Sequence, residues 1–482
     1  MKQASIKKNF IMNAILTMSS FIFPFITFPY VSRILLPEGY GKVQFATSVI
    51  SYFSMFAQLG IPTYCVRVCA QVREDKEELT RRAHELLFIN LITNIISYTV
   101  LLVLLQTVPK FRAEKSLLVI VSATIFLTSI GMEWLYKALE QYTYITIRSV
   151  MFKFIALVAM FLLVHEKSDY VVYGGITIFA SSASNILNLI NAHKYIGFKP
   201  VGNYDWKRHL KPVAIFFAMA CASTIYTNLD NVMLGFMATD ADVGYYGAAV
   251  KIKTILVSIV TSLGAVVLPR ASFYVENGDI DAFQRICKKA LNFVILLATP
   301  LTVYFMIFAK YGILFLSGDA YEGAIAPMQV IMPTLLLIGI TNIFGIQILV
   351  PTGREKIVLY SEIAGAIVDI IINVLLIPSM KSIGAAIGTL VAEFVVLIVQ
   401  YAALGDEISW ALNEVHYKRI LLAVLLGTVG CIWVCWLDLG IFTTLFISAI
   451  LFFGIYGVFL LVKREELVVE ICGQVFSPLI KR

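Results

Sequence analysis

Charged side chains lie inside apolar stretches of this 482-residue chain, and they are the residues that could do chemistry. The stretch from 224 to 264 consists of two long apolar segments joined by a short polar turn at 238–244. Asp230 precedes that turn and Lys251 follows it, so at about 1.5 Å of rise per residue both lie ~10 to 12 Å deep. We expect these charges to face each other or a polar cavity, because exposure to lipid is costly.

Six ionisable side chains lie deep within the predicted apolar segments: Lys153, Asp230, Lys251, Lys253, Asp369 and Glu393. If all six faced lipid, inserting each charge into the membrane would cost about 2.5 to 3.5 kcal/mol, or roughly 15 to 21 kcal/mol together. That sum exceeds the net stability of a typical folded protein, about 5 to 15 kcal/mol. A hydrated central cavity is therefore expected.

The basic members of this set suit an anionic ligand, since lysine and arginine bind phosphate oxygens through charge-assisted hydrogen bonds. Lys251 and Lys253 are two residues apart, about 200° around a helix, so both cannot face one partner. We expect one to pair with Asp230 and the other to face the cavity; internal pairing alone is the alternative. Three further cations at the ends of apolar segments are substrate-binding candidates, or ordinary interfacial side chains: Arg33, Arg67 and Arg270.

Small polar residues form a stripe at helical spacing on the sixth predicted span, near the end of the first half: Ser181, Ser184, Asn185, Asn188 and Asn191. Steps of three and four residues place them on one helical face. Asn185 and Asn188 are accordingly candidates for binding glycan hydroxyl groups. The alternative is that the stripe forms hydrogen bonds between membrane helices.

Two acids are candidates for coupling transport to an ion gradient. Asp369 and Glu393 lie about 12 residues from opposite ends of two neighbouring apolar segments, near the expected bilayer midplane. Two close carboxylates in a poorly hydrated site disfavour double ionisation, so they could hold a proton or share a sodium ion. The alternative is that each faces a different helix.

Enzyme motifs are missing from the sequence. The five histidines form no HExxH pattern, the seven cysteines form no CxxC pair, and no GxxxxGK[ST] loop is present. We therefore expect no catalysis, no cofactor and no metal site. Transport would draw on a proton or sodium gradient, or on consumption of the substrate.

The composition predicts an all-α polytopic membrane protein. Hydrophobic residues make up 59% of the chain and charged residues 14%, against roughly 25% charged residues in soluble domains. Apolar runs of about 20 residues, long enough to cross the hydrocarbon core, recur along the whole chain. We count about fourteen transmembrane helices.

The distribution of basic residues predicts the orientation in the membrane. When the connections are assigned alternately, 27 of the 38 lysines and arginines fall on the side that holds both termini, and 8 fall on the other side. The positive-inside rule therefore places both termini in the cytoplasm. This asymmetry also accounts for the net charge of +7 without a nucleic-acid partner.

The chain also repeats itself. EGYGKVQFATS followed by AQLGIP in the first half corresponds to VGYYGAAVKIK followed by TSLGAVVLP in the second. The two copies of the repeat start at the first and the seventh predicted spans. They therefore predict two six-helix bundles in the same orientation, residues 1–210 and 211–410. Residues 411–482 would add two helices and a cytoplasmic tail. Chance similarity between apolar sequences is the alternative.

Two segments carry a resemblance to a known family. FPYVSRILLPEGYGKVQFATSVISYFSMFAQLGIPTYCVR resembles the opening of the polysaccharide repeat-unit flippases, the Wzx or O-antigen transporter family of the MATE-like MOP exporter superfamily. NLDNVMLGFMATDADVGYYGAAVKI resembles the second half of these proteins. One departure is visible, since Leu36-Pro37 replaces the Gly-Pro that many relatives carry before Tyr-Gly.

The resemblance implies a flippase in the bacterial cytoplasmic membrane. It would move undecaprenyl-diphosphate-linked oligosaccharide repeat units to the outer leaflet by alternating access, during synthesis of cell-surface polysaccharide. Its partners would be the polyprenyl-diphosphate-linked glycan, membrane lipids, a polysaccharide polymerase and other assembly proteins. The alternatives are a multidrug or organic-cation antiporter of the MATE type, a lipid II flippase, and a non-transporting scaffold.

Overall fold

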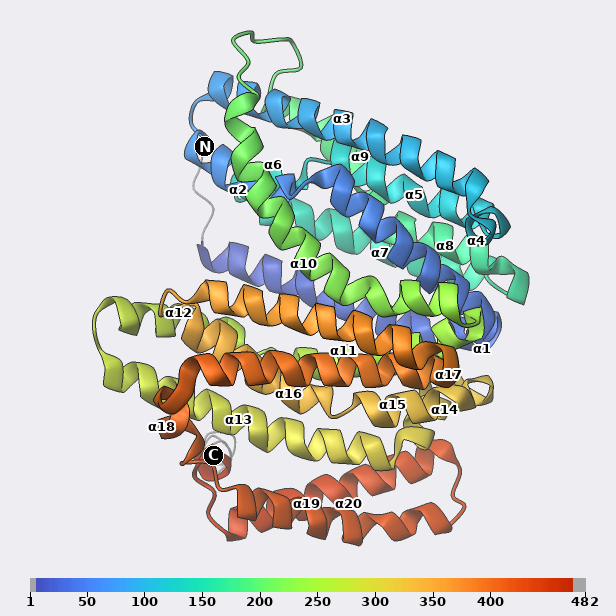
Figure 1. The fold of residues 1–482 in the computed structure, drawn as a ribbon, viewed down its shortest axis with the longest axis vertical. Coiled ribbons are helices and arrows are strands. Elements are labelled where there is room, and N and C mark those ends of the chain that lie inside the picture. Colours follow the sequence, from blue (N-terminus) through green and yellow to red (C-terminus); the bar gives the residue numbers. More distant parts are fainter. Residues whose placement is uncertain (1–5, 471–482) are drawn as a thin grey trace, which may run out of the picture. The chain divides into compact units, whose positions relative to one another are not determined.

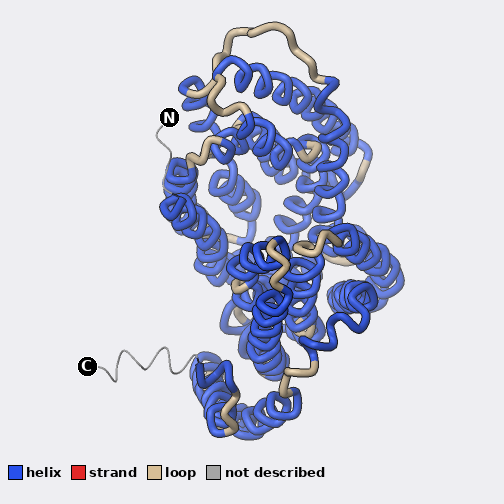
Figure 2. The backbone as a smooth tube through the Cα atoms, turned by 90° about the vertical axis from the view of Figure 1, so that its left-hand side faces the viewer, coloured by secondary structure: helices blue, strands red, loops and turns tan. Residues whose placement is uncertain are grey.

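The computed structural model describes residues 6–470, which form helices and loops without a β-strand (Figures 1 and 2). Within them, eleven helices are long and apolar enough to cross a membrane, or up to twelve if one bent pair counts as a span. The predicted all-α polytopic class is therefore confirmed. The predicted number of about fourteen spans is not confirmed.

The lower count has a structural reason, because two of the helices reverse direction at a single residue. In α1 (Ile6–Gln58), Leu36 has a φ of 57°. A straight helix would separate Phe28 from Tyr40 by about 18 Å, but their ring centroids lie 5.1 Å apart. The residue before a proline is disfavoured in helical conformation, so the break falls at Leu36-Pro37.

The second reversal lies in α17 (Glu355–Leu404), where Lys381 has a φ of 50°. Gln400 donates from Nε2 to Oγ of Ser361 at 3.1 Å, a pair that a straight helix would hold about 58 Å apart. The two limbs of α17 therefore lie side by side as an antiparallel hairpin.

The chain divides into two compact units, residues 1–244 and 245–482. The described part of the first unit has the helices α1, α2 (Ile61–Gln71), α3 (Lys76–Thr107), α4 (Pro109–Ala113), α5 (Lys115–Ile130), α6 (Glu133–Ala138), α7 (Tyr142–Leu163), α8 (Tyr170–Ile178), α9 (Asn185–Asn191) and α10 (Lys207–Met237). Short irregular turns of helix lie at Lys167–Asp169, Phe179–Ala183 and Ala192–Lys194. Figure 1 shows these helices in blue to green.

The boundary between the units falls within α11 (Asp240–Thr261). The second unit continues with α12 (Gly264–Glu276), α13 (Ile280–Ile307), α14 (Ala309–Ser317), α15 (Ile325–Ile331), α16 (Thr334–Thr341), α17, α18 (Ser409–Leu412), α19 (Tyr417–Ile432) and α20 (Ile441–Val462). The segment Asn342–Leu349 is a π-helix. The division at 1–210, 211–410 and 411–482 expected from the repeat stays a prediction.

The helix pair predicted from residues 224–264 is present as α10 and α11. Only Ala238 and Thr239 separate the two helices, so the turn is shorter than expected. The carboxylate of Asp242 accepts from the backbone N–H of Thr239 at 3.2 Å and from its hydroxyl at 2.6 Å. This reciprocal capping begins α11 at once.

A close backbone approach closes this end of the first unit. A Cβ atom at Gly41 would overlap the carbonyl oxygen of Asp240, and one at Gly244 would overlap that of Pro37. The turn within α1 and the turn before α11 are thus in direct contact through positions that only glycine can fill.

Candidate functional site

A polar cavity of about 400 Å³ lies within the first unit, between the second limb of α1, the start of α2 and the middle of α10. Six polar side chains line it: Ser51, Ser54, Gln58, Thr63, Thr224 and Asn228. Hydroxyl and amide groups both donate and accept hydrogen bonds, so they match the hydroxyl groups of a sugar. They are poor partners for an apolar ligand.

Helical spacing explains why these groups converge. Ser51, Ser54 and Gln58 are three and four residues apart on α1, and Thr224 and Asn228 are four apart on α10. The Gln58 amide donates to Oγ of Ser54 at 2.8 Å and to Oγ1 of Thr128 in α5 at 3.2 Å, which fixes its orientation. Two polar stripes, one on each helix, therefore face the same cavity.

Helix α2 carries a cation one turn beyond Thr63, which lines this cavity. Its residues Tyr64, Cys65 and Val68 are buried, whereas Thr63 and Arg67 lie on the opposite, exposed face, one turn apart. Arg67 forms no ion pair with any other residue in the described range. Its guanidinium is free to bind a phosphate group with the paired donors that phosphate recognition requires.

The start of α2 is set by backbone geometry. Gly60 has a φ of 71°, and a Cβ atom there would overlap the backbone of Phe216 and Phe217 in α10. Pro62 lies in the first turn of α2, where the missing N–H costs no hydrogen bond. Thr63 and Arg67 are consequently carried by a helix that packs closely on α10.

The structure places the predicted charged hairpin in two different environments. Asp230 is buried in α10, 8% exposed. Lys251 and Lys253 are half-buried on α11, and within the described second unit neither forms an ion pair. The pairing of Asp230 with one of these lysines stays a prediction.

The other predicted cations lie apart from the cavity lining. Arg33 and Arg270 are exposed, and Nη1 of Arg33 donates to the carbonyl oxygen of Pro29 at 2.5 Å. Lys153 on α7 donates to the hydroxyls of Ser19 and Ser20 at 2.9 and 2.8 Å. The charge of Lys153 is thus solvated by two hydroxyl groups of α1.

The polar stripe near residues 181–191 lies inside the helix packing. Asn185 and Asn188 are buried, and Oδ1 of Asn185 accepts from Nη1 of Arg148 at 3.1 Å. Arg148, itself 4% exposed, also donates to Glu133 at 3.1 Å. These contacts show hydrogen bonding between helices at Asn185, and the role of both asparagines in binding substrate stays a prediction.

The two candidate coupling acids lie on opposite limbs of the α17 hairpin. Asp369 is 2% exposed and Glu393 6% exposed. Oδ1 of Asp369 accepts from Asn373 at 3.2 Å and lies so near Gly388 that a Cβ atom there would approach it to 2.8 Å. Glu393 lies five residues beyond Gly388, about 7.5 Å along the helix, so the acids occupy neighbouring positions on facing limbs.

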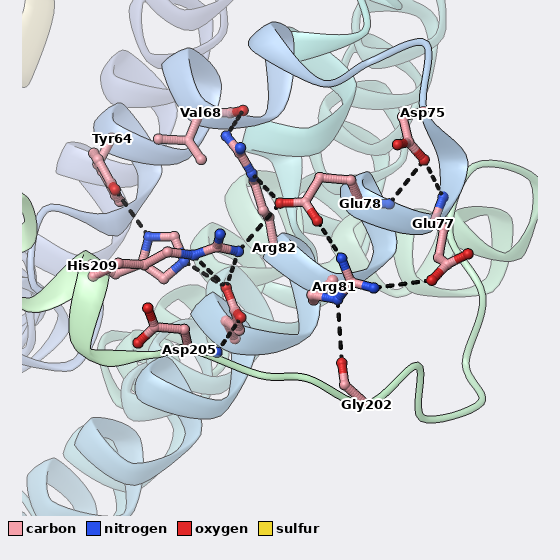
Figure 3. Close-up of polar contacts among 12 residues, drawn as sticks. Tyr64, Val68, Asp75, Glu77, Glu78, Arg81, Arg82, Gly202, Asp205 and His209 are labelled. Atoms are coloured by element: carbon pink, nitrogen blue, oxygen red, sulfur yellow. Dashed lines mark hydrogen bonds and ion pairs between the residues drawn. The ribbon is translucent and has the colours of Figure 1, made fainter.

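A buried cluster at the end of the first unit opposite Gly41 was not anticipated from the sequence (Figure 3). Glu85 of α3 accepts hydrogen bonds from Arg208 and His209 at the start of α10. Glu85 and His209 are 124 residues apart in sequence. The only signal for their contact is that both lie close to loops expected on the same side of the membrane.

Residues 6–470 hold no group of three His, Cys, Asp or Glu side chains that could bind a metal ion.

Two family models match the chain. The family described as "Polysaccharide biosynthesis protein" matches residues 6–275, and the MatE family matches residues 214–375. A protein from Escherichia coli (strain K12) named "Putative O-antigen transporter" is 24% identical over 394 residues, 81% of this chain and 95% of that protein. A protein of the same name from Shigella dysenteriae is 23% identical over 82% of this chain and 99% of its own length.

Two solved structures share the fold. The lipid II flippase MurJ in an inward closed conformation superposes with a TM-score of 0.63 at 16% identity, covering 95% of this chain and 99% of that chain. An inward-facing multidrug resistance MATE family transporter of the MOP superfamily superposes with a TM-score of 0.63 at 13% identity, covering 84% and 99%. Both similarities concern the fold.

Proposed function

The chain belongs to the polysaccharide biosynthesis protein family, and we propose that it is a MOP-superfamily flippase for lipid-linked polysaccharide repeat units. The names of its relatives from Escherichia coli and Shigella dysenteriae support transport of an O-antigen type of glycan. The multidrug antiporter, the lipid II flippase and the scaffold are not favoured by these relatives. The substrate we propose is an oligosaccharide linked to undecaprenyl diphosphate.

The observation that carries this proposal is the polar cavity lined by Thr63 of α2, with Arg67 one turn further along the exposed face of the same helix. A lipid-linked oligosaccharide presents sugar hydroxyls beside a diphosphate. The serine, threonine and amide groups of α1 and α10 would bind the hydroxyls, and Arg67 would bind the phosphate oxygens. From the sequence we also propose that Lys251 or Lys253 of α11 binds the diphosphate.

Alternating access would expose this site to one side of the membrane and then to the other. We propose that the moving bodies are the six-helix bundles 1–210 and 211–410, and that residues 411–482 are an addition to them. The proposed location is the bacterial cytoplasmic membrane with both termini in the cytoplasm. A polysaccharide polymerase and other assembly proteins would act with it.

The energy would come from an ion bound in the second unit. Asp369 and Glu393 are both buried in α17, and Asn373 supplies a neutral amide beside Asp369. Two close carboxylates in a poorly hydrated site disfavour double ionisation, which favours binding of a proton or a cation. We propose that a proton or sodium ion binds here during the transport cycle.

Reconstitution in vesicles tests the function directly. The purified protein is placed in liposomes that contain a fluorescent undecaprenyl-diphosphate oligosaccharide, and an impermeant quencher reports which leaflet holds the label. The intact protein should equilibrate the label, whereas Arg67→Ala should slow it and Arg67→Lys should retain part of the rate. Arg285→Ala is the matched control, because Arg285 is an exposed arginine on α13 outside the proposed site.

Each outcome is decisive. If intact protein leaves the lipid-linked oligosaccharide in its original leaflet but exchanges an organic cation for protons, the antiporter is correct. If Arg67→Ala and Arg285→Ala both transport at the rate of the intact protein, Arg67 does not bind the substrate.

A further inference from the structure

The carboxylate of Glu85 binds His209, which Figure 3 shows beside Tyr64. The Glu85 side chain is fully buried and accepts from the backbone N–H of Asp205 at 2.6 Å. It also accepts from Nη2 of Arg208 at 2.7 Å and from Nε2 of His209 at 2.8 Å. Three separate donors, one of them a guanidinium, offset the cost of burying this charge. The carboxylate thereby fixes the start of α10 against α3.

The imidazole of His209 extends this cluster to α2. Because an ionised carboxylate can only accept, Nε2 of His209 carries the hydrogen that it donates to Glu85. In the neutral imidazole the other nitrogen then accepts, and Nδ1 lies 2.9 Å from the hydroxyl oxygen of Tyr64. One ring therefore links a carboxylate on α3 to a phenol on α2, and all three side chains are buried.

Tyr64 lies on the buried face of α2, directly after Thr63 of the polar cavity and three residues before Arg67. A rotation of α2 about its axis would move the Tyr64 hydroxyl away from His209 and would turn Thr63 and Arg67 away from the cavity. The bond to His209 is therefore a rotational constraint on the helix that carries the proposed phosphate ligand.

A second polar contact acts on the same helix. Arg82 of α3 donates from Nη1 to the carbonyl oxygen of Val68 at 3.2 Å and from Nε to Glu78 at 2.9 Å. Glu78 also lies 3.4 Å from Nη2 of Arg208. Both contacts to α2 thus originate from the same group of charges on α3 and α10.

We propose that Glu85, His209 and Tyr64 are positioning residues that hold α2 at the rotation in which Thr63 and Arg67 face the polar cavity. This inference rests on the proposed function for the role of Arg67, but the orientation of α2 can be measured without any substrate. Supporting side chains of this kind are needed because a binding group that is loosely held loses much of its effect.

The first experiment measures the orientation of α2 directly. Spin labels are attached at Gln71→Cys on α2 and Lys211→Cys on α10, two exposed positions, in full-length protein in lipid nanodiscs. The other cysteines that could react are replaced by serine: Cys221, Cys435 and Cys472. We expect a single narrow distance distribution by pulsed electron paramagnetic resonance, and a shifted or broadened one in His209→Leu.

Three further variants make the test specific. Tyr64→Phe removes only the hydroxyl, so it should broaden the distribution even if His209→Leu fails to fold. His209→Gln keeps a donor and an acceptor and should restore much of the original distribution. The matched control is His84→Leu, because His84 bonds to Tyr204 and to the carbonyl oxygen of Gly197 at the same end of the unit and, among the described residues, forms no hydrogen bond to α2.

The second experiment measures transport at varied concentrations of the fluorescent lipid-linked oligosaccharide. Loss of one positioning hydrogen bond should raise the half-saturating concentration by about tenfold, the factor that corresponds to about 1.4 kcal/mol. The maximal rate should change less. A general folding defect would instead lower the maximal rate through the amount of active protein, with the half-saturating concentration unchanged.

The two experiments separate the possible failures. A distance distribution that stays narrow and unshifted in both Tyr64→Phe and His209→Leu would overturn the positioning role. A distribution that broadens while Arg67→Ala transports normally would leave the positioning role intact and would reject the proposed use of Arg67.

Discussion

The ammonium of Lys110 lies 2.5 Å from Oδ1 of Asp240, which joins the start of α4 to the first residue of α11. These residues are 130 positions apart in sequence. When connections are assigned alternately to the two sides of the membrane, both fall on the side opposite the termini. The ion pair places both segments at one end of the first unit. At the other end, Arg208 pairs with Glu85 of α3, and Arg81 of α3 donates to the carbonyl oxygen of Gly202.

The distribution of basic residues predicts which of these two ends of the first unit faces the cytoplasm. We expect Arg112→Cys, next to Lys110 and exposed, to react with an impermeant maleimide in intact cells, and Lys199→Cys to react only after lysis. The reason is the excess of basic residues on the side of the termini. The reverse labelling pattern would show that the termini are external.

The contact between Gly41 and Asp240 predicts a sensitive position. Gly41→Ala should destabilise the protein by about 1 to 3 kcal/mol, because the new methyl group meets a backbone carbonyl that cannot turn aside. Thermal unfolding in detergent measures the loss. Gly457→Ala on α20 is the control, since its Cβ atom would meet nothing within 4 Å; equal melting temperatures for the two variants would refute the overlap.

Arg148 should contribute more to stability than Lys137, although both bind Glu133. Arg148 is buried and also bonds to Asn185, whereas Lys137 is about 40% exposed. Arg148→Met should therefore cost about 3 to 5 kcal/mol, the usual effect of breaking a buried pair. Lys137→Met should cost less than about 1 kcal/mol. The yield of folded, monodisperse protein measures the loss in each variant. Equal losses for Arg148→Met and Lys137→Met would show that the Arg148 contacts contribute little.

The coupling proposal predicts a change in the response to gradients. Asp369→Asn and Glu393→Gln should each reduce transport driven by a proton or sodium gradient, while equilibration without a gradient persists. Glu355→Gln at the exposed start of α17 serves as the control. Vesicle transport with and without ionophores measures the difference, and normal coupling in both acid variants would end the proposal.

The lysines of α11 should differ from each other, since they point about 200° apart around the helix. If one binds diphosphate and the other pairs with Asp230, one alanine variant should lose transport while folding normally, and the other should fold poorly. The variant that folds poorly should regain expression when combined with Asp230→Asn, because no charge is then left unpaired. Full activity and expression of both Lys251→Ala and Lys253→Ala would exclude both roles.

The sequence alone determined the membrane class and the presence of the α10–α11 pair. These properties depend on composition and on apolar runs of sufficient length, which are local and can be read without knowing any contact. The same local reasoning located Asp230 and Lys251 at one expected depth. The count of about fourteen spans is not confirmed, because α1 and α17 each reverse at one residue, Leu36 and Lys381, and so join two limbs without a loop between them.

The tertiary structure decided which polar groups meet. Ser51 and Thr224 face one cavity, and Glu85 binds His209, although each pair is separated by more than a hundred residues. Spacing along one helix reveals which side chains share a face, but it carries no information about which other helix that face contacts. The partner helix depends on how whole helices pack. Here that packing makes His209 the buried link between α3 and α2.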